Sequence, residues 1–195
     1  MTADLIAALP AREGHFRLES GYHTDLWLTL DALFVNPREM APRVTALAAR
    51  IRPHGVTAVC GSLLGGAFLA QALAIELGIE FYFSEPVASN GDAKMFSAEY
   101  RLPDALRSRI RGHRVALVDD VISAGSSVRA TAIALTSAGA SIAVVGALFV
   151  LGRIAIDHFA SLSIPLESLG QRDFTMWDPS SCPLCAADMP LEDPR

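Results

Sequence analysis

The sequence predicts an α/β fold in which helices flank a mostly parallel, twisted sheet. Short apolar runs, typical of buried parallel strands, alternate along the chain with segments whose apolar residues recur at helical spacing. The composition agrees, because 51% of the 195 residues are hydrophobic and only 7% are aromatic. Such a mixture, rich in Ala, Leu and Val, suits a sheet covered by helices, and one domain of this length buries most of its apolar surface.

The first half of the chain is predicted to contain a strand pair followed by a strand–helix–strand unit. We expect a short helix over 1–12 and short strands over 15–19 and 25–30. Pro37 begins a helix that runs to about residue 52, because proline fits the first helical turn. The unit that follows consists of strand 56–60, glycine loop 61–66, helix 67–77 and strand 79–83.

The second half continues the alternation, which favours a parallel sheet. Segment 93–102 has no helical period and is predicted to form a hairpin or flexible flap. The expected elements after it are helix 103–110, strand 115–118, helix 128–135, strand 142–151, helix 155–159 and strand 164–169. Beyond about residue 171 several Pro and Asp residues predict an irregular tail. We therefore divide the chain into a domain over 1–170 and a tail over 171–195.

Charge and composition exclude several classes of protein. The net charge is −5 and the sequence has no basic stripe, which argues against binding to nucleic acid. The N-terminus has no basic segment before an apolar core, so it does not resemble a signal peptide. No apolar run is long enough to cross a membrane, and three cysteines make a disulfide framework implausible. A cytoplasmic enzyme or binding protein is expected.

The segment over residues 115–128 carries the clearest functional signal. An apolar strand leads into Asp119 and Asp120, and a loop of small residues then opens the next helix. The loop consists of Ser123, Ala124, Gly125, Ser126 and Ser127. Backbone N–H groups of such a loop converge on one anion, and the helix N-terminus adds a favourable dipole. The loop therefore predicts a phosphate site.

The two aspartates call for a different ligand group. Carboxylates repel phosphate, so Asp119 and Asp120 suit hydroxyl groups or a metal ion beside the phosphate. A ligand with a phosphate at one end and vicinal hydroxyls at the other is a ribose 5-phosphate. The alternative is an ordinary strand–turn–helix with an acidic turn.

The glycine loop over 61–66 is a second candidate anion site. It consists of Gly61, Ser62, Leu63, Leu64, Gly65 and Gly66. Because it follows a strand and opens a helix, its N–H groups could hold a pyrophosphate. Close packing of strand against helix explains Gly65 and Gly66 about as well.

Two stretches together resemble a known family. Residues 115–128 resemble the phosphoribosyl-pyrophosphate motif of type I phosphoribosyltransferases, and residues 14–24 resemble the Phe-x-Leu-x-Ser-Gly signature of the orotate enzymes. Arg153 stands where those enzymes have an arginine that holds orotate. The resemblance implies the type I phosphoribosyltransferase fold, with a small N-terminal hood and a flexible flap. It also implies a homodimer that uses Mg²⁺ to transfer phosphoribosyl from phosphoribosyl pyrophosphate to a nucleobase, most directly orotate, giving orotidine 5-monophosphate and pyrophosphate.

The resemblance assigns roles to particular residues. Asp119 and Asp120 are assigned to catalysis, where they hold the ribose hydroxyls and, through water, Mg²⁺. Lys94 is assigned to catalysis as a cation. The 5-phosphate is assigned to Ser123, Ala124, Gly125, Ser126 and Ser127. The pyrophosphate is assigned to Gly61, Ser62, Leu63, Leu64, Gly65 and Arg101. The base is assigned to Arg153 and Ser123, since a guanidinium group donates two parallel hydrogen bonds to a carboxylate.

The sequence departs from this family where positive charge is expected. The Arg-Lys pair that usually follows the strand matching 79–83 is absent. Glu19 stands where many members have lysine, and Leu64 stands where some members have lysine. Lys94 and Arg101 are the next cations along that segment. Cations beside a leaving pyrophosphate stabilise its charge. The chain is therefore either a divergent enzyme that uses Lys94 and Arg101, or a regulatory protein that binds phosphoribosyl ligands with little or no catalysis.

Cys182 and Cys185 in the tail have the spacing of half a zinc site. Asp178 or Asp188, a histidine, or a dimer mate could complete it. The alternatives are two reduced thiols or a redox-labile disulfide. His15 and His23 show no partner in the sequence and are expected at the surface or in loops, while Cys60 is expected to be a small buried hydrophobic residue.

Overall fold

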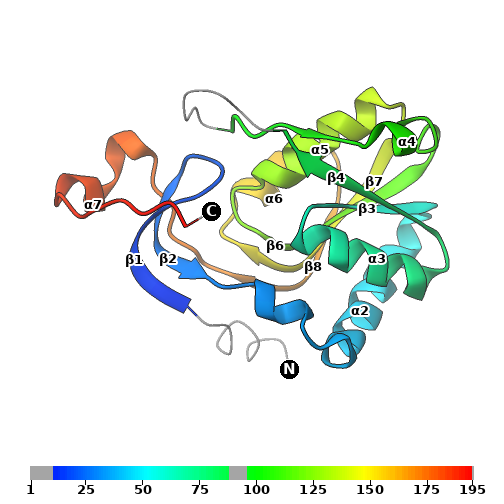
Figure 1. Ribbon diagram of the computed structural model, residues 1–195, viewed down its shortest axis with the longest axis horizontal. Coiled ribbons are helices and arrows are strands. Elements are labelled where there is room, and N and C mark those ends of the chain that lie inside the picture. Colours follow the sequence, from blue (N-terminus) through cyan, green and yellow to red (C-terminus); the bar gives the residue numbers. More distant parts are fainter. Residues whose placement is uncertain (1–10, 88–95, 195) are drawn as a thin grey trace.

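A six-stranded sheet forms the centre of the molecule. The computed structural model describes residues 11–87 and 96–194. Within these residues the strands lie in the order β5-β4-β3-β6-β7-β8 (Figure 1). Their bounds are β3 Ala58–Ser62, β4 Glu80–Pro86, β5 Tyr100–Arg101, β6 Arg114–Ile122, β7 Ser141–Leu151 and β8 Leu166–Arg172. Every neighbouring pair is parallel except β4 and β5, which confirms the predicted α/β fold with a mostly parallel sheet.

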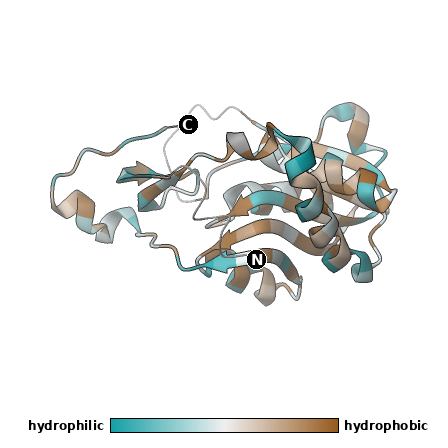
Figure 2. Ribbon diagram, turned by 90° about the horizontal axis from the view of Figure 1, so that it is seen from below, coloured by the Kyte–Doolittle hydropathy of each residue, from teal (hydrophilic) through white to brown (hydrophobic). Residues whose placement is uncertain are grey.

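Helices cover both faces of this sheet. Alternate residues of β6 pack into two separate apolar clusters, because successive side chains of a strand point to opposite faces. Val115 and Leu117 belong to the cluster with α5 (Ser126–Ser137) and α6 (Ile154–Ser161). Ala116 and Val118 belong to the cluster with α2 (Pro37–Ile51) and α3 (Gly65–Leu77). The strands between the two layers are mainly hydrophobic in Figure 2.

Three short helices lie in the connections between these elements. They are the 3₁₀ helices η1 (Asp31–Phe34) and η2 (Arg52–His54), and α4 (Asp104–Arg107). Within the described residues, no helix has the length and apolar character that a membrane crossing would need.

A two-stranded antiparallel sheet lies beside the main sheet (Figure 1). It consists of β1 (Ala11–Arg17) and β2 (His23–Leu28) and corresponds to the predicted strand pair. The predicted helix over 1–12 falls mainly on residues 1–10, which lie outside the described residues, while residues 11–12 are strand. The segment 88–95 also lies outside them, and the rest of the expected flap contributes β5, which pairs with β4.

The C-terminal tail packs against this small sheet and is more ordered than its composition predicts. It contains the 3₁₀ helix η3 (Pro179–Ser181) and α7 (Pro183–Ala186). The Arg17 N–H donates to the Glu192 carbonyl at 2.9 Å, and the His23 N–H donates to the Trp177 carbonyl at 2.9 Å. The expectation that His15 and His23 lie at the surface or in loops is wrong, because they lie in β1 and β2 with only 1% and 4% of their surface exposed.

Two boundaries near the phosphate loop differ from the predicted ones. Strand β6 continues to Ile122, so Asp119 and Asp120 belong to the strand instead of following it. Helix α5 begins at Ser126, two residues earlier than expected. The uninterrupted apolar run ends at Val118, so a prediction based on apolar residues alone ended the strand too early. As a result, Ser126 and Ser127 lie in the first turn of α5.

Candidate active site

A pocket of about 380 Å³ lies at the carboxyl ends of β3 and β6. Both predicted anion loops line it, because parallel strands deliver their outgoing loops to the same edge of the sheet. The lining includes Ser62, Leu63, Leu64, Gly65, Asp119, Asp120 and all of 121–127. The structure thus joins two segments that are more than fifty residues apart in the chain.

Asp119 accepts three hydrogen bonds in the pocket. Its Oδ2 accepts from Ser62 Oγ at 3.0 Å and from Ser127 Oγ at 2.6 Å, and its Oδ1 accepts from the Asp120 N–H at 3.2 Å. Burial, and then the nearby Asp120 charge, raise the pKa of Asp119 well above its ordinary value. The site therefore favours a positive charge or a hydroxyl donor next to this pair.

Gly65 and Gly66 bring the glycine loop directly onto the two acids. A Cβ added at Gly65 would lie 2.7 Å from Cγ of Asp120, and one at Gly66 would lie 2.5 Å from Oδ1 of Asp119. A side chain at Gly65 would require the Asp120 carboxyl group to move, and one at Gly66 would also require movement of the Val118 carbonyl, 2.9 Å away. Close packing is thus the physical reason for these glycines, and the surface against which they pack is the acidic pair itself.

The loop before α5 has the features of a phosphate site. Gly125 adopts a φ of 84° as the N-cap of the helix, a conformation that other L-residues rarely adopt. The Ser126 hydroxyl is buried and has no hydrogen-bond partner within the described part of the chain. A buried hydroxyl at a helix N-terminus suits an anion, which would accept its hydrogen bond.

Among the residues that the structure describes, no lysine or arginine lines the pocket, although Glu19 does. Tyr100 Oη donates to Glu19 Oε1 at 2.9 Å, and burial followed by the Glu19 charge raises the pKa of Tyr100. Sequence reasoning did not assign a role to Tyr100 or to Trp27, which also line the pocket. Neither residue lies in a recognisable motif, and only the fold brings them there.

The predicted cations lie elsewhere or outside the described residues. Arg101 Nη2 lies 2.8 Å from Glu85 Oε1, and its side chain is 64% exposed. Arg153 Nη2 lies 3.2 Å from Asp157 Oδ1, and its side chain is 68% exposed. Neither residue lines this pocket as described, and Lys94 falls in the segment outside the described residues. Their roles stay predictions.

A smaller space of about 150 Å³ adjoins the pocket. The two share Leu18, Trp27, Leu30, Val121 and Ser123, and the smaller one also contacts Leu151 and Phe174. Its walls are mainly apolar, as a planar ring requires. Leu151, which lines this space, ends β7 two residues before Arg153.

A larger cavity of about 540 Å³ lies between the small sheet and the segment after β8. It includes none of the residues of the two anion loops. We place the candidate active site in the pocket of about 380 Å³, since that is where the buried acids and the anion loops meet.

Comparisons with known proteins agree with this geometry. Residues 34–155 match the family described as phosphoribosyl transferase domain. The chain is 31% identical over 182 residues to the orotate phosphoribosyltransferase of Thermotoga maritima, covering 93% of this chain and 90% of that protein. It is 30% identical to the orotate phosphoribosyltransferase of Pelotomaculum thermopropionicum, covering 100% of this chain and 97% of that protein.

Solved structures share the fold at lower sequence identity. Orotate phosphoribosyltransferase from Aeropyrum pernix superimposes with a TM-score of 0.65 at 22% identity, over 88% of this chain and 93% of that chain. The Giardia lamblia enzyme APRTase, complexed with 9-deazaadenine, gives a TM-score of 0.68 at 15% identity, over 88% and 97% of the two chains. Since enzymes named for different bases share the fold, the fold alone does not select the base.

Proposed function

The chain belongs to the phosphoribosyl transferase family, and from this premise we propose that it transfers a phosphoribosyl group from phosphoribosyl pyrophosphate to orotate. The bond between ribose C1 and the pyrophosphate oxygen breaks, a bond between C1 and the base nitrogen forms, and the proton of that nitrogen passes to the released pyrophosphate or to solvent. The observation that carries the proposal is the meeting of two anion loops around one acidic pair. The products are orotidine 5-monophosphate and pyrophosphate.

The pocket residues hold the donor at its two charged ends. The loop over 123–127 receives the 5-phosphate, with the Ser126 hydroxyl as a donor. Asp119 and Asp120 accept hydrogen bonds from the ribose hydroxyls. The loop over 61–66 receives the pyrophosphate through its remaining backbone N–H groups, since that of Leu63 donates to the Ser84 carbonyl at 2.9 Å. In this arrangement the protein orients the donor and no side chain attacks it.

The donor set suits Mg²⁺. Two buried carboxyl groups face a pocket that, in its described part, has no cationic side chain, so a polyanionic donor needs a counter-charge. Asp119 and Asp120 would hold the ion through water. When bound, Mg²⁺ stabilises the negative charge of the leaving pyrophosphate. These carboxyl groups must be ionised to hold Mg²⁺. The raised pKa of Asp119 disfavours that ionisation, and the positive charge of the ion favours it.

Lys94 and Arg101 are the cations that we propose to act on the pyrophosphate, and Arg153, with Ser123, is the proposed contact of the base. The loss of one well-placed cation commonly costs about 3 kcal/mol in the barrier, roughly a hundredfold in rate. Because the family's usual Arg-Lys pair is missing, we expect slow turnover. Lys94→Ala should lower it further, whereas Arg107→Ala on α4 should not.

Steady-state assays of the full chain test the acceptor. The protein is supplied with phosphoribosyl pyrophosphate, Mg²⁺ and one base at a time from orotate, uracil and adenine, and pyrophosphate release is measured. Release that requires both orotate and Mg²⁺ supports the proposal. Preference for adenine would contradict the assignment of the base. Binding of the donor without turnover of any base would favour a regulatory protein.

We also propose that the protein is a homodimer. An apolar groove of about 390 Å³ lies between α2 and α3 and is lined mainly by hydrophobic side chains, among them Met40, Val44, Phe68 and Ile75. Phe68 and Ile75 are 52% and 78% exposed. Exposed apolar surface of this kind marks protein–protein contacts. A second copy of the chain would cover it.

A further inference from the structure

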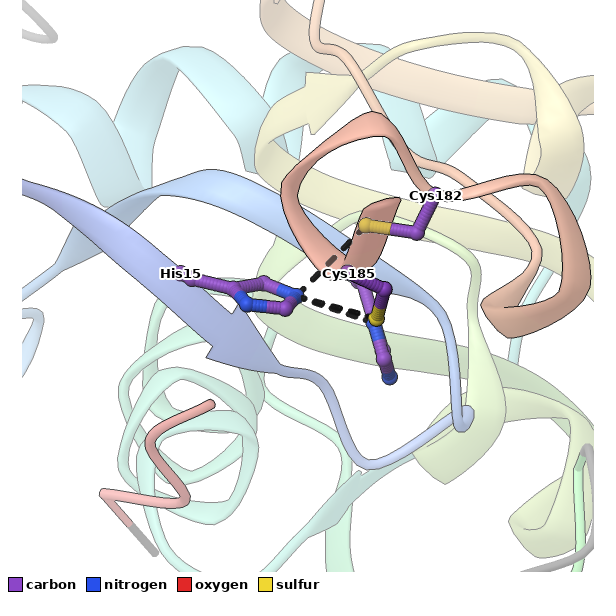
Figure 3. Close-up of side chains that lie close together, drawn as sticks. His15, Cys182 and Cys185 are labelled. Atoms are coloured by element: carbon purple, nitrogen blue, oxygen red, sulfur yellow. Dashed lines mark hydrogen bonds between the residues drawn. The ribbon is translucent and has the colours of Figure 1, made fainter. Parts of the chain in front are cut away.

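Four metal-binding side chains meet between the small sheet and the tail. His15 lies on β1, His23 on β2, Cys182 just before α7 and Cys185 within α7. One donor atom from each lies within 4.8 Å of all the others. Figure 3 shows the imidazole of His15 pointing at both sulfur atoms. All of these residues lie outside the pocket described above.

Four distances between donor atoms are close to those of a tetrahedral ligand set. His15 Nε2 lies 3.0 Å from His23 Nδ1, 3.5 Å from Cys182 Sγ and 3.7 Å from Cys185 Sγ, while Cys185 Sγ lies 3.3 Å from His23 Nδ1. Zinc bonds of about 2.0–2.1 Å to nitrogen and about 2.3 Å to sulfur would place neighbouring ligand atoms roughly 3.3–3.8 Å apart. Three of the four distances lie in this range, and the distance of 3.0 Å between His15 Nε2 and His23 Nδ1 is slightly shorter.

Hydrogen bonding prepares His15 to act as a ligand. Its Nδ1 lies 2.9 Å from the Met189 carbonyl, which can only accept, so Nδ1 carries the proton. The lone pair of Nε2 then points at the other three donors. A backbone carbonyl in this role is the usual partner of a metal-bound imidazole. Met189 belongs to the tail, so the tail both supplies two sulfur ligands and orients one nitrogen ligand.

One of the carboxylates considered as a ligand is engaged elsewhere. Asp178, considered above as a ligand, instead accepts hydrogen bonds from the Ser180 N–H at 2.9 Å and Ser180 Oγ at 2.6 Å. The two histidines complete the half site, and no carboxylate is needed.

We propose that His15, His23, Cys182 and Cys185 bind one structural Zn²⁺ that fastens the C-terminal tail to the small sheet. A closed set of two nitrogen and two sulfur ligands favours zinc over Mg²⁺, which prefers oxygen ligands. Binding replaces the two thiol protons, so two protons are released and no electron moves.

The ion would also hold one wall of the active site. The turn between His15 and His23 contains Leu18, Glu19 and Ser20, all of which line the pocket. Since both ends of this turn carry a zinc ligand, the ion fixes the turn relative to the acidic pair. We therefore expect loss of zinc to raise the KM for the phosphoribosyl donor more than it lowers kcat.

Metal analysis of untagged protein purified without chelator tests the site. We expect about one zinc per chain, and its loss in Cys182→Ser and in His23→Asn. Cys60→Ser is the matched control, because Cys60 is buried in β3 away from the cluster and should leave the zinc content unchanged. A folded wild-type protein without metal, or zinc that persists in both ligand variants, would overturn the proposal.

Cobalt substitution gives a second readout. Co²⁺ in the wild-type protein should produce the intense visible bands of a tetrahedral site with thiolate charge transfer, and these should vanish in Cys185→Ser. A chelator should lower the unfolding temperature of the wild type but not that of the ligand variants. An octahedral cobalt spectrum, or a disulfide between Cys182 and Cys185 in freshly purified protein, would also overturn the proposal.

Discussion

Asp119 is a carboxyl group whose burial opposes its ionisation, so substitution should affect stability and ligand binding in opposite directions. Its pKa is raised from an ordinary value of 3.8, and the folded chain therefore holds the proton more tightly than the unfolded chain. Stability then falls as pH rises from that ordinary value through the raised one. In ligand-free and metal-free protein, Asp119→Asn should be more stable than the wild type near neutral pH, and the difference should shrink below about pH 4.

The same substitution should weaken binding of the phosphoribosyl donor. Removing a charged acceptor of hydrogen bonds costs about 1.5–3 kcal/mol, roughly ten- to a hundredfold in affinity. Urea unfolding and titration calorimetry measure the two effects. Asp104→Asn on α4 is the matched control, because Asp104 is exposed and lies outside the pocket. Unchanged affinity in a folded Asp119→Asn variant would show that Asp119 does not bind the phosphoribosyl donor.

Arg153 tests the assignment of the base at the level of one side chain. If its guanidinium group binds the orotate carboxylate, Arg153→Ala should raise the KM for orotate about ten- to a hundredfold and change that for the phosphoribosyl donor little. Asp157→Ala is the control, since it removes the 3.2 Å partner of Arg153 but keeps the arginine. Equal kinetics for Arg153→Ala and the wild type would show that another group contacts the base.

The packing of the glycine loop on β6 gives a prediction at the level of secondary-structure elements. Gly65→Ala should destabilise the fold by about 1–3 kcal/mol, because the added methyl group overlaps Asp120. It should also weaken binding of the phosphoribosyl donor by displacing that acid. Titration calorimetry and thermal unfolding report these two effects.

Gly78→Ala, at the other end of α3, is the matched control. Gly78 has a φ of 70° and no atom near an added Cβ, so alanine there should cost stability through backbone strain alone. Its affinity for the donor should equal that of the wild type. Equal loss of affinity in both variants would show that α3 acts through general stability and not through Asp120.

The predicted association concerns the whole molecule. Ile75→Glu places a charge in the apolar groove between α2 and α3 and should shift the protein from dimer to monomer, because burying an unpaired charge is costly. Ile133→Glu on α5 is the control, as Ile133 is 68% exposed and lies outside the groove. Analytical ultracentrifugation measures the mass. A monomeric wild type, or a dimeric Ile75→Glu variant, would contradict the proposed interface.

The sequence by itself determined the fold class, the family and the place of the acidic strand and the small-residue loop after it. Each of these depends on neighbours in the chain: strand and helix periods in 115–135, and the contiguous acid–loop–helix pattern around Asp119. Such patterns are local and can be read from one stretch of residues. Even there, apolar periodicity misplaced the end of β6, because the strand continues through two buried carboxyl groups.

Only the tertiary structure decided which distant residues meet. His15 lies next to Cys182, 167 positions along the chain, and Tyr100 contacts Glu19 across 81 positions. The reason why Gly65 must be glycine lies in Asp120, fifty-five positions away. These contacts arise when the sheet orders its strands and the tail returns to β1 and β2, and no local pattern records that arrangement. For this reason the acidic motif and the Cys182–Cys185 half site were recognisable in the sequence, whereas the two histidines that complete the cluster were not.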